Sequence, residues 1–96
     1  MKREEIRKTL RTLKPAIDQK FQADVEGFFG SQARGDAGEG SDLDVLVRFR
    51  THAGLYELVE LGDFLEGIFH CRVDIVSARA LPEEFAAHIS ANLVRI

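Results

Sequence analysis

Two short motifs constrain this chain more than any other feature, and five residues separate them. The first, GSQARG from Gly30 to Gly35, is a turn of small residues that can bring backbone N–H groups close to a phosphate. The second, SDLD from Ser41 to Asp44, places two carboxylates one residue apart at the start of a segment rich in Val and Leu. Because side chains alternate along a strand, Asp42 and Asp44 should lie on one face and could share a divalent cation. The two motifs together predict a site for Mg²⁺ and a nucleoside triphosphate.

The size and composition of the chain limit what else it can contain. Its 96 residues predict a single domain, residues 1–96, with no room for a separate substrate-binding domain, so the acceptor is expected on a partner. No apolar run approaches the length of a membrane span, and the N-terminus has acidic residues where a signal peptide would be apolar. These features predict a cytoplasmic protein without a membrane partner. Cys71 is the one cysteine and is predicted to be a buried or half-buried core residue.

The charge is unevenly distributed along the sequence. Residues 1–20 carry seven basic and three acidic side chains, while the whole chain has a net charge of −3, so the remaining residues sum to −7. An acidic surface of this kind argues against general nucleic-acid binding, because such binding depends on neutralising phosphates. The basic segment is interpreted as a solvated helix face, with an acidic partner or an RNA end as the alternative.

The first half of the chain predicts a helix, a strand and a turn. Apolar residues recur every three or four positions over a segment from about Glu4 to Lys20, which is typical of an amphipathic helix, although Pro15 should kink or divide it. Residues 25–29 are predicted as a strand. Ser31 is predicted to cap a short helix that ends at Gly35, and residues 36–40 as a glycine-rich loop.

The second half predicts two further strands and two helices. The strands are expected at 43–49 and 72–76, with a long amphipathic helix at 55–69 between them. Pro82 should begin a last helix, with a buried side formed by Phe85, Ala86, Ile89, Leu93 and Ile96. The predicted fold class is therefore α+β, a small sheet of about three strands with helices packed over one face.

Asp74 is the candidate third carboxylate, since a neighbouring strand could bring it to Asp42 and Asp44, and three such groups can hold two metal ions. Asp74 would also help to take a proton from the attacking hydroxyl. Each carboxylate has a simpler interpretation: the pair could be a solvated turn, and Asp74 could face solvent from an edge strand. His52, His70 and His88 lack metal-ligand spacing and are predicted to be surface or partly buried residues.

Four further residues are candidates for nucleotide binding. Gly30 lets the backbone approach a phosphate, and Ser31 would hold the β- or γ-phosphate through its hydroxyl and adjacent N–H groups. Arg34 could reach phosphate oxygens or could equally be a structural arginine. Ser41 is expected to position the aspartates rather than to contact the substrate.

The pattern G-S-x-A-R-G, five residues, S-D-x-D and a lone Asp in R-V-D-I-V resembles the minimal nucleotidyltransferases of the DNA polymerase β-type superfamily. This resemblance implies a mixed-sheet nucleotidyltransferase fold, Mg-ATP as the donor, and Asp42, Asp44 and Asp74 as a metal triad. It also implies a companion protein. Members are often antitoxins paired with a helical HEPN ribonuclease toxin, which some inactivate by transferring AMP to a tyrosine.

Two functions from different classes follow. The first is an adenylyltransferase that modifies a partner toxin, and the second is a module that keeps the fold but masks its partner by stoichiometric binding. Intact carboxylates favour the enzyme. Exposed apolar residues on the long helix or on the last one are expected to form the partner surface. The sequence leaves open whether the protein forms a homo-oligomer.

Overall fold

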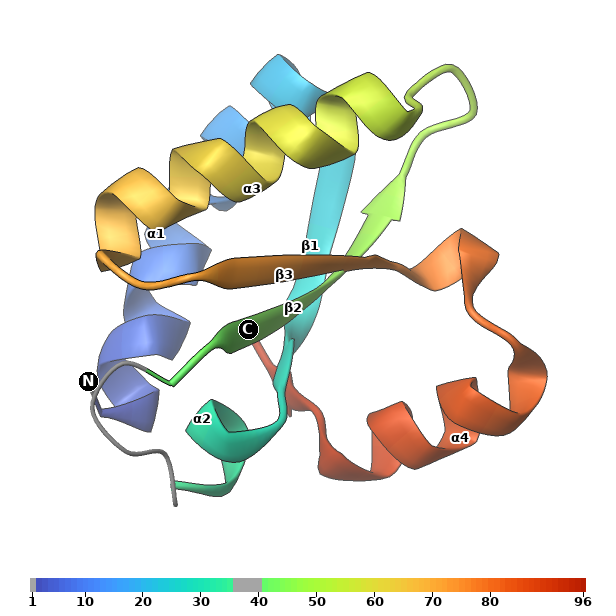
Figure 1. The fold of residues 1–96 in the computed structure, drawn as a ribbon. Helices are drawn as coiled ribbons and strands as arrows, with labels where there is room; N and C mark the ends of the chain where they lie inside the picture. The colour runs from blue at the N-terminus through green and yellow to red at the C-terminus, as the bar shows by residue number, and fades with distance from the viewer. Residues whose placement is uncertain (1, 36–40) are drawn as a thin grey trace.

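The structure is a computed structural model that describes residues 2–35 and 41–96. The predicted loop at 36–40 lies outside the described residues. Helices and strands alternate along the chain (Figure 1), in the order α1 (Arg3–Phe21), β1 (Ala23–Phe29), α2 (Ser31–Arg34), β2 (Leu43–Phe49), α3 (Leu55–Phe69), β3 (Val73–Ser77), η1 (Ala78–Ala80), α4 (Glu83–Asn92) and β4 (Val94–Arg95).

The strands form one mixed sheet in the order β3-β2-β1-β4. Strand β1 pairs antiparallel with both β2 and β4, whereas β2 and β3 run parallel and are joined by α3. A parallel pair needs such a crossover, because its two strands must start at the same edge of the sheet. The predicted α+β class and the mixed sheet are confirmed, with a fourth strand added.

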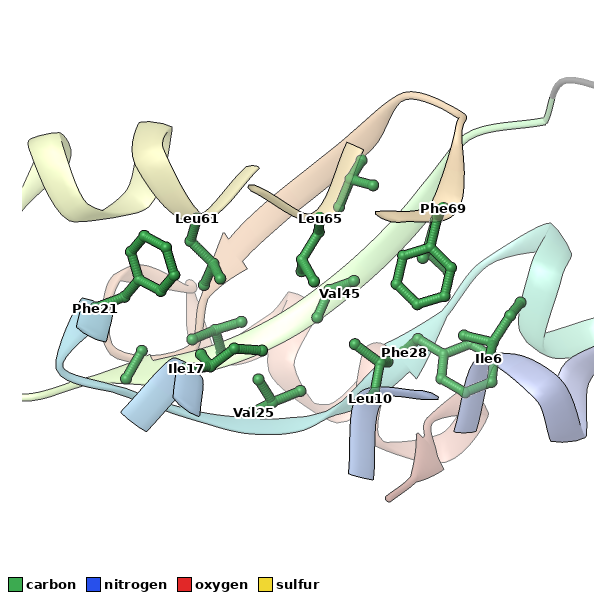
Figure 2. Close-up of a cluster of buried hydrophobic side chains, with 14 of the residues drawn as sticks. Ile6, Leu10, Ile17, Phe21, Val25, Phe28, Val45, Leu61, Leu65 and Phe69 are labelled. Atoms are coloured by element: carbon green, nitrogen blue, oxygen red, sulfur yellow. The ribbon is translucent and has the colours of Figure 1, made fainter. Parts of the chain in front are cut away.

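The core lies between one face of the sheet and the helices α1 and α3 (Figure 2). Each element contributes apolar side chains at its own period: every three or four residues from a helix, every second residue from a strand. The fully buried side chains include those of Ile6, Leu10, Ile17, Val25, Phe28, Leu43, Val45, Val47, Leu61 and Leu65. This core fixes which face of β2 remains for polar residues.

Helix α1 continues through Pro15, so the prediction that proline divides it is wrong. Proline costs about 3 kcal/mol inside a helix. Leu10 and Ile17, which flank it, are both fully buried, and each such side chain contributes about 1.5–3 kcal/mol. Burial on both sides therefore outweighs the local cost.

The end of the chain differs from the prediction. The last helix ends at Asn92 and buries no residue, and Phe85, which was expected inside, is 57% exposed. Leu93 lies beyond the helix, and β4 follows it, pairing with Gly27 and Phe28 of β1. Two residues are too few to show strand alternation in the sequence, which is why this strand was not predicted. Among the described residues, no helix has the length and hydropathy needed to cross a membrane.

Candidate functional site

The parallel pairing of β2 and β3 brings two of the three predicted carboxylates together. Asp44 and Asp74 are direct partners in the register of the two strands. Leu43, Val45 and Val47 point into the core, so by alternation Asp44 points to the opposite face. Asp42 precedes the strand and is exposed, yet it is close enough for its charge to act on Asp44.

The pKa of the Asp44 carboxyl is raised above its ordinary value by partial burial and by nearby negative charge. Partial burial makes the largest contribution, followed by the charges of Asp74 and Asp42 and a side-chain hydrogen bond with Asp74. The positive charge of Arg34 acts in the opposite direction. Asp74 also forms an ion pair with Arg72, with its Oδ1 3.3 Å from Nε. A bound cation would relieve this repulsion.

Gly30 begins the turn next to these carboxylates, with φ +80° and ψ −156°, a conformation that is essentially restricted to glycine. A Cβ built on Gly30 would lie closer than 3.0 Å to Asp44 Oδ2 and 3.4 Å from its Cγ. The turn and the β2 carboxylate are therefore in direct contact only because residue 30 has no side chain.

Gly30, not Ser31, occupies the N-cap position of α2, so the predicted capping by Ser31 is wrong. The carbonyl of Gly30 accepts hydrogen bonds from the N–H groups of Ala33 and Arg34, and Ser31 is the first helical residue. The left-handed φ of Gly30 turns the chain sharply after β1, which shifts the helix start by one residue relative to the prediction. Gly35 ends the helix, as predicted.

Gln32 is a positioning residue that the sequence did not reveal. Its side chain is only 7% exposed, and its Nε2 donates a 3.1 Å hydrogen bond to the backbone carbonyl of Ser41. Arg3 of α1 donates to the carbonyl of Ala33 at 3.2 Å. The two bonds fasten the turn to the segment that carries Asp42 and to the first helix. A glutamine in a turn looks solvent-exposed in a sequence, so no signal identified this role.

A cavity of about 400 Å³ opens beside the turn. Gly30, Arg34 and Asp44 line one side of it, and three residues of α4 line the other. The volume falls within the range of ordinary ligand sites. The roles predicted for Ser31, Arg34 and Ser41 in nucleotide binding stay predictions.

The chemistry of these side chains fits Mg²⁺. Residues 2–35 and 41–96 contain no three His, Cys, Asp or Glu side chains already converged on a metal position. Mg²⁺ needs no such cage, because it usually takes one or two carboxylates and completes its shell with water and phosphate oxygens. Asp44 and Asp74, with Asp42 nearby, offer that incomplete set. Their role as ligands stays a prediction.

Comparison with known proteins identifies the family. A family model described as the nucleotidyltransferase domain matches residues 4–95, nearly the whole chain. The chain belongs to the nucleotidyltransferase domain family. The resemblance seen in the two motifs is thereby confirmed.

Three relatives of this nucleotidyltransferase are informative. Protein adenylyltransferase MntA of Thermococcus cleftensis is 34% identical over 93 residues, covering 97% of this chain and 94% of the relative. The solved structure of a proposed minimal nucleotidyltransferase is 35% identical and superposes with a TM-score of 0.77, covering 100% of this chain and 97% of the other. A toxin–antitoxin structure with AMP-PNP shares the fold at 21% identity and a TM-score of 0.72, covering 99% of this chain and 72% of the other.

Proposed function

We propose that this protein is a Mg²⁺-dependent adenylyltransferase that transfers AMP from ATP to a protein acceptor. The observation that carries the proposal is the direct pairing of Asp44 and Asp74 beside the Gly30 turn. The match to MntA along nearly the entire chain supports the same assignment.

The proposed reaction forms one bond and breaks one. A hydroxyl oxygen of the acceptor attacks the α-phosphorus of ATP, the bond between the α- and β-phosphates breaks, and pyrophosphate leaves with the electron pair. When bound, Mg²⁺ neutralises phosphate charge and orients the entering and leaving oxygens. Asp42, Asp44 and Asp74 would hold it, and three carboxylates can hold two such ions.

The chain's own residues prepare the reactants. Asp74 would accept the proton of the attacking hydroxyl, a role supported by its partly exposed side chain on an edge strand of the sheet. Arg34 lines the cavity with Asp44 and brings positive charge to the position proposed for the phosphates. Gly30 and Ser31 would supply backbone N–H groups and a hydroxyl, and Ser41 would hold the aspartate segment in place.

The proposed acceptor is a toxin of the HEPN ribonuclease type, encoded next to this protein. The sequence resemblance implies such a partner, and the shared fold with a toxin–antitoxin structure is consistent with it. The exposed apolar residues Leu55, Tyr56 and Val59 on α3, together with Phe85 on α4, are available for the contact.

The test is transfer of label from ATP to the neighbouring gene product. Purified protein, Mg²⁺ and ATP labelled at the α-phosphate are incubated with that product, and the same reaction is run with γ-labelled ATP. The proposal predicts that only the α-label stays on the partner. Asp44→Asn and Asp74→Asn should abolish transfer, while Asp24→Asn, an acidic residue on β1 paired with Lys14, should leave it intact.

The alternative function is stoichiometric masking of the partner without chemistry. It predicts a stable complex that carries no label, together with toxin inhibition that survives Asp44→Asn. The direct pairing of Asp44 with Asp74 favours the enzyme, because two carboxylates held side by side repel each other unless they bind a cation. Label on RNA in place of protein would instead indicate transfer to an RNA end.

A further inference from the structure

Helix α4 forms the second wall of the cavity beside Asp44. His88, Ile89 and Asn92 line the cavity across from Gly30 and Asp44. In Figure 1, α4 and α2 lie on the same side of the strands, whereas α3 lies on the other side. The helix therefore faces the predicted catalytic residues and not the core.

Helix α4 is held in place by its connections to the sheet and not by burial of its own side chains. The helix buries no residue, yet both of its ends are tied to the sheet, through β3 and η1 before it and through β4 after it. A helix whose place is fixed by its connections, and whose side chains are exposed or half-buried, contributes little to stability through burial. Its inner face is free to be a binding surface.

The charges of the two walls differ. Asp44 and Arg34 make the sheet side ionic, whereas the helix side presents the apolar side chain of Ile89, the amide of Asn92 and the imidazole of His88. The acidic residues of α4, Glu83 and Glu84, are in its first turn, more than one turn from Asn92. A ligand that matches this cavity has a strongly charged end and an end that combines apolar surface with hydrogen-bonding groups, as a nucleoside triphosphate does.

The orientation of the Asn92 amide is determined by a hydrogen bond. Its Nδ2 donates to the backbone carbonyl of His88 at 3.0 Å. A carbonyl can only accept, so the NH₂ group must point to the helix and Oδ1 must point away from it. Asn92 therefore presents an acceptor. The exocyclic group at position 6 is a donor in adenine and an acceptor in guanine.

We propose that α4 is the nucleoside wall of the ATP site, with Asn92 Oδ1 accepting a hydrogen bond from the adenine amino group and His88 and Ile89 packing against the base. This inference rests on the proposed function and identifies the residue that would make the enzyme prefer ATP to GTP. Asn92 determines base specificity, while His88 supplies a stacking surface that any purine can use.

Binding measurements separate the two roles. The full chain is titrated by calorimetry, in Mg²⁺ and without acceptor, with ATP, GTP and inorganic tripolyphosphate. Wild type should bind ATP more tightly than GTP. Asn92→Ala should weaken ATP binding about tenfold, the equivalent of one good hydrogen bond, and leave the affinity for GTP unchanged. His88→Ala should weaken the binding of both nucleotides about fivefold. Neither variant should alter tripolyphosphate binding.

Ser90→Ala on the same exposed helix is the matched control and should bind all three ligands as wild type does. Circular dichroism of each variant checks that the fold is retained. The inference is overturned if wild type binds ATP while Asn92→Ala keeps the same ATP to GTP ratio. It is also overturned, together with the proposed function, if wild type binds neither ATP nor tripolyphosphate.

Discussion

Gly30→Ala should separate catalysis from folding. The added Cβ would lie closer than 3.0 Å to Asp44 Oδ2, where a carbon and an oxygen normally stay about 3.3 Å or more apart. The carboxylate end can move more easily than backbone can, so Asp44 should shift by roughly 1 Å, an error that costs on the order of 100-fold in rate. The positive φ of +80° adds a backbone cost of about 1–3 kcal/mol.

Gly35→Ala is the matched control for this substitution. Gly35 also has a positive φ, +81°, but a Cβ there meets nothing within 4 Å. In urea denaturation Gly35→Ala should lose about 1–2 kcal/mol of unfolding free energy, and Gly30→Ala about 1–3 kcal/mol. Only Gly30→Ala should lose AMP transfer under conditions where both proteins are folded. Wild-type transfer by Gly30→Ala, or an equal loss in Gly35→Ala, would refute the reasoning.

Three other perturbations test the frame around the site. Gly27→Ala should lower the free energy of unfolding in urea by about 1–3 kcal/mol, because its Cβ would collide with the carbonyl of Val94 and displace β4. The control Gly67→Ala on α3 meets open space and should not destabilise the protein. Equal stabilities of the two variants would contradict the β1–β4 pairing. Gln32→Leu should lower AMP transfer and reduce the free energy of unfolding by about 1 kcal/mol, since the hydrogen bond to the carbonyl of Ser41 disappears. Unchanged transfer would show that this hydrogen bond does not position Asp42. Burial, assisted by nearby carboxylates, raises the pKa of the Cys71 thiol. Iodoacetamide should therefore react more slowly at pH 8 with the folded protein than with the urea-unfolded chain. Equal rates would contradict the raised pKa.

Short-range patterns in the sequence predicted the strands that carry the site. Alternation placed Asp44 opposite Leu43 and Val45, and the structure keeps that arrangement. The pairing of Asp44 with Asp74 could be anticipated because the intervening helix is long enough for a parallel crossover.

The parts that were not predicted depend on contacts between distant segments. The role of Gln32 depends on a backbone carbonyl nine residues away, which no local pattern records. Phe85 and Ile89 have the spacing of a buried helix face, and only the tertiary structure shows that Ile89 lines a cavity while Phe85 is exposed. Two-residue β4 exists because it pairs with Gly27 and Phe28.

The most direct test of the account is whether the paired carboxylates bind the metal that accompanies ATP. Mn²⁺ in place of Mg²⁺ can be titrated into the full chain with AMP-PNP, and bound Mn²⁺ can be quantified by electron paramagnetic resonance. Wild type and Asp24→Asn should bind Mn²⁺ equally, and Asp44→Asn and Asp74→Asn should each weaken binding at least tenfold. Mn²⁺ binding by Asp44→Asn at the wild-type level would contradict the central claim.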